Sequence, residues 1–362
     1  MAAYTTIDDS EAFFQCVLWT GDGNDDRNIT LPGETDMQPD IVWVKGRQAD
    51  HSHRFFDAAR GATKYLNTAT NGTEGTGADT VQAFQSDGFQ VGTDGSHNTN
   101  TDTYIAWCWK AGGSGSSNTE GSINTTKTSA NTTSGVSINT FDGTGANATI
   151  GHGIGIKPTV LLCKNMASGS DNWNWNNFSF AALGNTGRIY FNESDGNSAA
   201  AAAWNSTAPT STLVSLGSNG ENNGTTMVLY AFAPVQGFSK FGSYLGNSNS
   251  DGAFVHTGFS PSLVIVKCTS NASTDWLMVD NKRSRARSSA YNNFMLRANT
   301  TAVEENGTVG CDFLSNGFKW RDSENSANVS GRTYSFMAFA YSPFCNSNGV
   351  PNNGVASTGG RG

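Results

Sequence analysis

The chain has 362 residues, enough for two or three domains that each bury a core. Charged side chains make up 14% of it, against about 25% in an average soluble protein, and the formal net charge is −8. Because phosphate binding needs a basic face, this balance excludes nucleic acid from the expected partners. The polar residues are mainly Asn, Ser, Thr and Gly, which favour turns and strand edges over helices. We therefore expect an all-β fold.

The chain begins with MAAYTTIDDSEAFFQ, which has no basic region followed by an apolar core. No run of about 18 apolar residues follows it. We therefore expect neither a secretion signal nor membrane insertion. Residues 1–18 contain the apolar Phe13, Phe14 and Val17 ahead of the first repeat, so this segment is predicted to be an N-terminal attachment arm.

The rest of the chain repeats itself three times. Each copy has an apolar strand that follows a proline and ends in a lysine, at Pro39–Lys45, Pro158–Lys164 and Pro261–Lys267. Each copy closes with a second apolar strand, at 103–109, 226–232 and 333–339. Strands without polar alternation are buried on both faces or packed in a sandwich core.

These copies predict three tandem, related antiparallel β-sandwich modules of jelly-roll type with short helical pieces. The expected boundaries are module 1 at 19–112, module 2 at 136–235 and module 3 at 236–345. Residues 113–135 form a linker by composition, or alternatively a hairpin in which Ser122–Thr125 pairs with the strand from Val136. An alanine run predicts a short helix at Ser198–Trp204, and residues 346–362 are expected to form a flexible C-terminal tail.

Two copies carry an aspartate and an arginine three residues apart, Asp57 with Arg60 and Asp280 with Arg283. The second copy has Asn176 and Ser179 instead. Such a pair could serve catalysis, but its recurrence in two modules favours an internal ion pair or turn brace. The sequence contains no GxSxG, HExxH or P-loop motif, and no catalytic residue is assigned. We expect the protein not to be an enzyme.

Histidines give a weak metal signal. His51 and His53 lie two residues apart and would share one face of a strand, but no third ligand is identifiable, so a polar loop is favoured. His152 and His256 stand beside glycines at similar places in their repeats, which favours a role in turns. We expect no metal and no cofactor.

The cysteines are far apart and show no CxxC pair. We expect free buried thiols, with disulfides as the alternative, at Cys16, Cys108, Cys163, Cys268, Cys311 and Cys345.

Aromatic side chains in stretches rich in Asn and Asp suit sugar rings, which stack on aromatic faces while their hydroxyls find hydrogen-bond partners. Trp173 and Trp276 occupy matching places in their repeats, so packing explains them. Trp175 and Trp204 have no obvious counterparts. They are therefore the predicted surface residues for ligand binding.

Several segments together resemble a repeat family of uncharacterised virion proteins from tailed, largely marine, bacteriophages, and the resemblance covers nearly the whole chain. The segments that carry it are Tyr4–Ile7, Asp57–Leu66, Ser86–Phe89, Tyr104–Gly112, Gly143–Gly145, Gly151–Gly153, Gly237–Tyr244 and Phe313–Phe318. The resemblance implies a structural component of the particle, such as a tail fibre or another surface appendage. It implies no active site, so no functional residue is transferred from it.

Three functions follow as hypotheses. The first is a tail fibre or receptor-binding protein that contacts host-surface glycans, is assembled in the host cytoplasm as a homotrimer, and joins other virion proteins through its N-terminal segment. The second is a capsid or tail decoration protein with a purely structural role, in which the aromatic residues pack between subunits. The third is a glycan-degrading tailspike, which needs two carboxylates about 5 to 9.5 Å apart in a cleft, and nothing in the sequence selects such a pair.

Overall fold

The computed structural model describes residues 7–179, 183–283 and 292–343. Its regular structure is almost entirely antiparallel strand, with one short helix, α1 (Gly95–Asn98), in these ranges. The all-β prediction is confirmed. Within the same ranges, no helix is long and apolar enough to cross a membrane.

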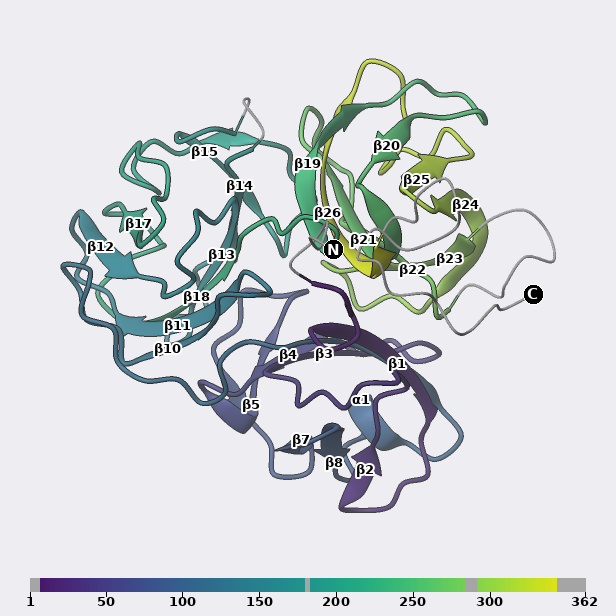
Figure 1. Cartoon of the computed structure of the whole chain (residues 1–362), viewed down its shortest axis with the longest axis horizontal. Coiled ribbons are helices and arrows are strands. Elements are labelled where there is room, and N and C mark those ends of the chain that lie inside the picture. Colours follow the sequence, from purple (N-terminus) through teal and green to yellow (C-terminus); the bar gives the residue numbers. More distant parts are fainter. Residues whose placement is uncertain (1–6, 180–182, 284–291, 344–362) are drawn as a thin grey trace.

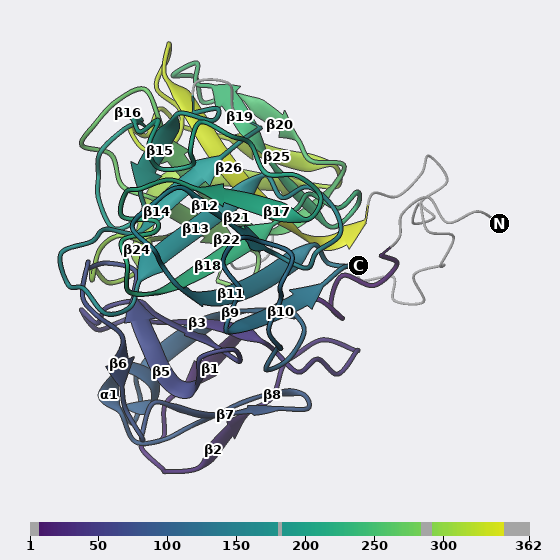
Figure 2. The same cartoon turned by 90° about the vertical axis from the view of Figure 1, so that its left-hand side faces the viewer.

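The first large sheet has the strand order β1-β9-β3-β4-β5-β6. Its strands are β1 (Phe14–Thr20), β9 (Thr103–Trp109), β3 (Ile41–Gly46), β4 (Arg54–Asp57), β5 (Gly61–Asn67) and β6 (Gly75–Thr76). A small sheet covers its outer face, built from β2 (Arg27–Ile29), β8 (Gly88–Val91) and β7 (Val81–Gln85). Figure 1 and Figure 2 both show this small sheet on the side away from the rest of the molecule.

The second large sheet has the order β10-β11-β18-β13-β14-β15-β16. Its strands are β10 (Lys127–Asn131), β11 (Val136–Asp142), β18 (Thr226–Phe232), β13 (Val160–Asn165), β14 (Asn174–Asn177), β15 (Gly187–Tyr190) and β16 (Ser198–Ala199). A two-stranded sheet of β12 (Ala148–Gly151) and β17 (Leu213–Leu216) packs against it.

The third large sheet has the order β19-β26-β21-β22-β23-β24-β25-β20, and its far end turns back so that β24 and β25 contact β21. Its strands are β19 (Ser239–Leu245), β26 (Thr333–Pro343), β21 (Phe259–Cys268), β22 (Leu277–Asp280), β23 (Asn292–Arg297), β24 (Glu305–Leu314), β25 (Gly317–Trp320) and β20 (Phe254–His256).

Five strands follow the same order in each large sheet. The series are β1-β9-β3-β4-β5, β11-β18-β13-β14-β15 and β19-β26-β21-β22-β23. The first two strands pair at the same point of the sequence repeat, as the partners Thr20 with Thr103, Asp142 with Thr226 and Leu245 with Thr333 demonstrate. We call these parts unit 1 (residues 14–109), unit 2 (residues 127–232) and unit 3 (residues 239–343).

The three units surround a common centre, as Figure 1 shows. In unit 1, Ile41 and Trp43 of β3 belong to the central core, whereas Val42 and Val44 belong to the core beneath the small sheet. Each large sheet is thus covered on one face by its own small sheet or folded-back strands and on the other by its neighbours. This explains why the strands have apolar residues on both faces.

Aromatic rings from all three units meet in the central core. Phe339 of unit 3 packs against Trp109 of unit 1 at 5.4 Å and against Phe232 of unit 2 at 6.0 Å between ring centroids. An apolar cavity of about 20 Å³ remains between the units. It is lined by residues of each unit, among them Trp43, Trp175 and Ile265.

Three predicted segments differ from the structure. The helix predicted at Ser198–Trp204 is wrong: Ser198–Ala199 form β16, which pairs with β15, and turns follow it. Seven residues are too few to hold a helix without tertiary packing, and Ala200 and Ala203 are buried in the unit 2 core instead. In the segment 113–135, the hairpin alternative describes the strands better than a linker does, since β10 pairs with β11, although its strand is Lys127–Asn131 rather than Ser122–Thr125.

The predicted arm at residues 1–18 does not stay separate from the first sheet. Phe14 to Leu18 lie in β1, and Ile7 and Phe14 are buried in the central core. Phe14 and Val17 are therefore core residues, and Phe13 packs against the core. Residues 1–6 and the predicted tail at 346–362 lie outside the described residues.

A buried asparagine clamps the loop after the first strand in each unit. The side-chain oxygen of Asn98 accepts from the backbone N–H of Asp22, and its amide donates to Asn24 O at 2.7 Å. Asn328 makes the matching bonds to the N–H of Asn247 and to Asn249 O, both at 3.1 Å. In unit 2 Asn222 accepts from Thr144 N–H at 2.7 Å. The signal in the sequence is an asparagine four or five residues before the closing strand.

We expect Asn328→Ala to lower the free energy of unfolding by about 1–2 kcal/mol, because it removes a buried side chain that holds the loop by hydrogen bonds to Asn247 and Asn249. The matched control is Asn325→Ala, at an exposed position three residues away, which changes it by under about 0.5 kcal/mol. Urea unfolding of both variants measures the difference. Equal losses would contradict the clamp.

Candidate functional site

The predicted ligand-binding tryptophans are not at the surface. Trp175 and Trp204 are 1% and 0% exposed, so their assignment as surface residues is wrong. Trp175 packs edge-on against Trp276 at 4.9 Å, and Trp204 packs against Phe178 at 5.9 Å. The asparagines beside Trp175 do not mark a loop, because they lie in β14 and are buried with it.

The aspartate–arginine pairs brace turns, as their recurrence predicted. Arg60 Nε donates to Asp57 Oδ2 at 2.5 Å, and its Nη2 donates to the Phe55 carbonyl. Arg283 binds Asp280 in the same way at 2.6 Å. All four side chains are almost completely buried. In unit 2 the register places Asn177, rather than Asn176, at the aspartate position.

Each of these positions also forms a hydrogen bond with a neighbouring unit. Tyr230 of unit 2 donates its hydroxyl to Asp57 at 2.6 Å, and Trp107 of unit 1 donates to Asp280 at 3.3 Å. Asn177 of unit 2 donates to the hydroxyl of Ser335 in unit 3 at 3.0 Å. Unit 1 thus contacts unit 2 at Asp57, unit 2 contacts unit 3 at Asn177, and unit 3 contacts unit 1 at Asp280. The three contacts close a ring around the centre.

The lysines that end the proline strands are buried and form a second ring of contacts. Lys45 Nζ donates to the carbonyls of Ala49 in its own unit and Thr301 in unit 3, at 3.2 and 2.9 Å. Lys164 Nζ donates to Asn71 O in unit 1 at 3.1 Å and to three carbonyls of its own unit.

Lys267 of unit 3 completes this ring. Its Nζ donates to Ser194 O in unit 2 at 2.9 Å and also to Thr274 in its own unit. Burial lowers the pKa of Lys45, Lys164 and Lys267 to about 8. The sequence repeat identified these lysines, but their role at the boundaries requires knowledge of which loops come next to them.

Backbone hydrogen bonds cross the same three boundaries. Glu74 N–H donates to Met166 O at 2.9 Å, Asn197 N–H to Thr269 O at 2.8 Å, and Glu304 N–H to Arg47 O at 2.8 Å. The acceptor residue is in each case the second after the buried lysine. We call these boundaries the seams. They hold the units together through repeated, specific contacts.

Two of the histidines considered in the sequence, His53 and His152, take part in packing and in a turn. His53 is buried between the rings of Trp43 and Trp107, and burial lowers its pKa well below the usual value. His152 accepts from Ile154 N–H at 3.2 Å, in the turn predicted for it. Among the described residues there is no group of three or more His, Cys, Asp or Glu side chains that could hold a metal ion.

The cysteines within the described ranges are free and buried, as expected. Burial raises the thiol pKa of Cys16, Cys108, Cys163 and Cys311. Cys345 lies outside the described residues.

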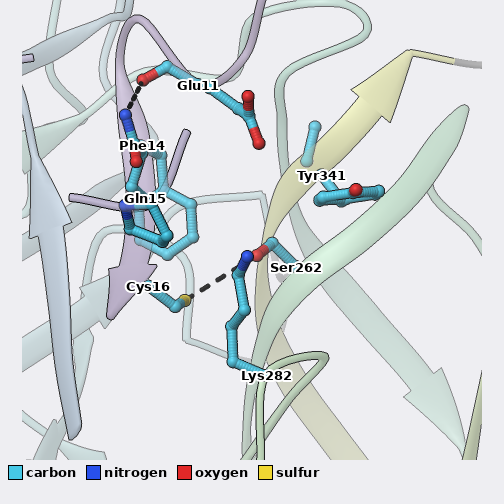
Figure 3. Close-up of a pocket in the computed structure, with 9 residues that line it drawn as sticks. Glu11, Phe14, Gln15, Cys16, Ser262, Lys282 and Tyr341 are labelled. Carbon is cyan, nitrogen blue, oxygen red and sulfur yellow. Dashed lines mark hydrogen bonds between the residues drawn. The ribbon is translucent and has the colours of Figure 1, made fainter. Parts of the chain in front are cut away.

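A narrow cleft lies where the start of the chain meets unit 3. Figure 3 shows Glu11 and Cys16 facing Lys282 and Tyr341 across it. Its volume of about 10 Å³ leaves room for no more than a water molecule. Ser10 Oγ donates to Tyr341 O at 2.6 Å, so the beginning of the described chain is fastened close to its end.

A larger hollow, which we call the seam groove, lies between unit 1 and unit 2 and has a volume of about 460 Å³. Unit 1 contributes Arg60, Lys64 and Glu74 to its lining. Unit 2 contributes Lys127, Thr140, Met166 and Thr226, and Thr126, which directly precedes unit 2, also lines the groove. Sequence reasoning missed this groove because its residues come from two units.

A family model described as a domain of unknown function (DUF7483) matches residues 9–343. Among curated proteins, none matches the chain. The match extends over all three units and their seams.

The buried lysines predict a pH dependence of stability. Unfolded Lys267 holds its proton up to about pH 10.5, whereas the folded residue releases it near pH 8, so the unfolded state binds more protons between these values. The free energy of unfolding therefore rises from pH 8 to 10.5, with as much as about 3 kcal/mol from this residue. We expect Lys267→Met to remove that part of the rise in urea unfolding curves.

Lys157→Met, at an exposed position of the chain, is the matched control and retains the wild-type slope. A wild-type slope in the Lys267→Met variant would contradict the assignment.

Proposed function

We propose that the chain, which belongs to the DUF7483 family, is a non-enzymatic structural virion protein of a tailed bacteriophage, a tail fibre or receptor-binding appendage that contacts host-surface glycans. The observation that carries this proposal is the closed arrangement of three units, in which Ser10 near the start of the described chain bonds to Tyr341 near its end. We propose that attachment takes place beside this contact and that the other surfaces are free to contact the host.

The seams support a mechanical role. Side-chain hydrogen bonds at Asp57, Asn177 and Asp280 join every unit to both of its neighbours, and so do the buried lysines and the backbone hydrogen bonds of the seams. Removing one partner of a buried polar contact costs more than the contact itself contributes, so the units resist separation. A body of this kind suits a particle component that must survive outside the cell.

The chain ends support attachment at one place. Ile7 is buried, Ser10 bonds to Tyr341, and residues 1–6 precede this point. We propose that residues 1–6 join another virion protein. Self-association as a homotrimer stays a prediction, and the central core needs no second copy because one chain supplies all three units.

The resemblance to phage virion proteins supports the proposed place in a virion. The uncharged polar composition supports the proposed contact with glycans. Asn, Ser, Thr and Gly dominate the polar residues, and hydroxyl and amide groups are suitable hydrogen-bond partners for sugars.

Gold labelling of intact particles with an antibody against this protein, viewed by electron microscopy, tests the proposal. We expect label at the tail and loss of host adsorption when the antibody is present. Label spread over the head with adsorption unchanged would contradict the fibre role and make the protein a decoration protein.

A variant that begins at Ile7 tests the attachment. Because the deletion spares every described residue, we expect the protein to fold as before and to be missing from purified particles. Wild-type amounts on particles would contradict attachment through residues 1–6.

A further inference from the structure

The seam groove has the dimensions of a ligand site. Its volume of about 460 Å³ falls within the range of about 300–1,000 Å³ typical of small-molecule sites, and it lies at a boundary between units, where such sites are common. By contrast, the cavity in the central core holds about 20 Å³ and the narrow cleft about 10 Å³.

The charges of the groove are unusual for this chain. Arg60, Lys64 and Lys127 line it with a single carboxylate, Glu74, and Arg60 is also paired with the buried Asp57, although the chain as a whole carries −8. Glu74 is already occupied, since it binds Lys64 at 3.0 Å and Arg60 at 3.3 Å. Within the described residues, the ammonium of Lys127 forms no ion pair. An anionic group in the groove would supply the partner it lacks.

The other lining groups suit a hydroxylated ring. Thr126 and Thr140 present hydroxyls that make no hydrogen bond to any described residue, and Met166 adds an apolar surface. A hollow of about 720 Å³ beside residues 112–120 has a lining of Gly, Ser, Thr and Asn with Glu120 as its charged side chain, so it lacks a cation for an anionic ligand.

We propose that the seam groove binds an acidic saccharide, a sugar ring that carries a carboxylate. The carboxylate pairs with Lys127, the ring hydroxyls bond to Thr126 and Thr140, and the C–H face of the ring lies on Met166. This inference rests on the proposed function and specifies the class of glycan. Binding at one such groove is weak, and several copies on a particle strengthen it through avidity.

The test uses the full chain and isothermal titration calorimetry with trigalacturonate, neutral galactotriose and inorganic phosphate. We expect binding of trigalacturonate that weakens as salt is added, because the charged groups are partly exposed. Lys127→Gln should weaken it about fivefold, the effect of losing one exposed ion pair. Lys157→Gln removes an equal charge from an exposed position and should leave binding unchanged.

Thr126→Trp provides a second variant that leaves the charges intact. Thr126 is exposed, so the change does not disturb the core, and the indole fills the groove. We expect this variant to lose trigalacturonate binding while its unfolding curve stays that of the wild type.

Three outcomes would overturn the inference. They are absence of trigalacturonate binding, equal binding of galactotriose or phosphate, and a Lys127→Gln variant that binds as the wild type does. None of these affects the gold labelling, so label at the tail together with any of them retains the appendage and rejects only the acidic saccharide. Saccharide binding by a protein that is missing from particles retains the groove and rejects the virion role.

Discussion

The structure depends on one constraint: each large sheet is apolar on both faces and must bury both. A small sheet, or strands that fold back, cover the outer face. The inner face has no such cover within its own unit. Three units solve this together, since the inner faces meet in a shared core where Phe339 packs against Trp109 and Phe232. Burial of apolar surface is the dominant favourable contribution to folding, so no unit completes its core without the other two.

The polar groups at the rim of this core follow from the same constraint. In β3, Lys45 lies on the face of Ile41 and Trp43, because side chains two residues apart in a strand share a face. The ammonium group of Lys45 therefore lies at the boundary of the core and needs hydrogen-bond acceptors there. Carbonyls of the neighbouring unit's loop supply them, and the same holds for Lys164 and Lys267. The direction of these contacts around the centre specifies the order in which the units meet.

Much of the fold was predictable from the sequence. The apolar strands, the turn braces at Asp57 and Asp280, and the free buried cysteines depend on local pattern, and the structure has them. The surface assignment of Trp175 and Trp204 failed for a physical reason. Asparagine in a strand can be buried when its amide finds a partner, as Asn176 does by donating to Gly184 O at 3.0 Å. Composition alone therefore does not separate a buried strand from a loop.

The seams were beyond prediction from one sequence. The repeat identifies Lys45, Lys164 and Lys267 as equivalent, but their partners lie in loops of different sequence that become neighbours only when the three units close. The seam groove has the same origin, since Lys64 and Lys127 belong to different units. Sites of this type arise from the arrangement of units rather than from a motif.

Backbone hydrogen exchange of the full chain in increasing urea tests the central claim most directly. If the three inner faces share one core, the amides of β3, β13 and β21 should exchange through a single opening reaction with one free energy. Exchange in one of these strands at a distinctly lower free energy than in the other two would show a unit that opens alone, and would contradict a core that needs all three.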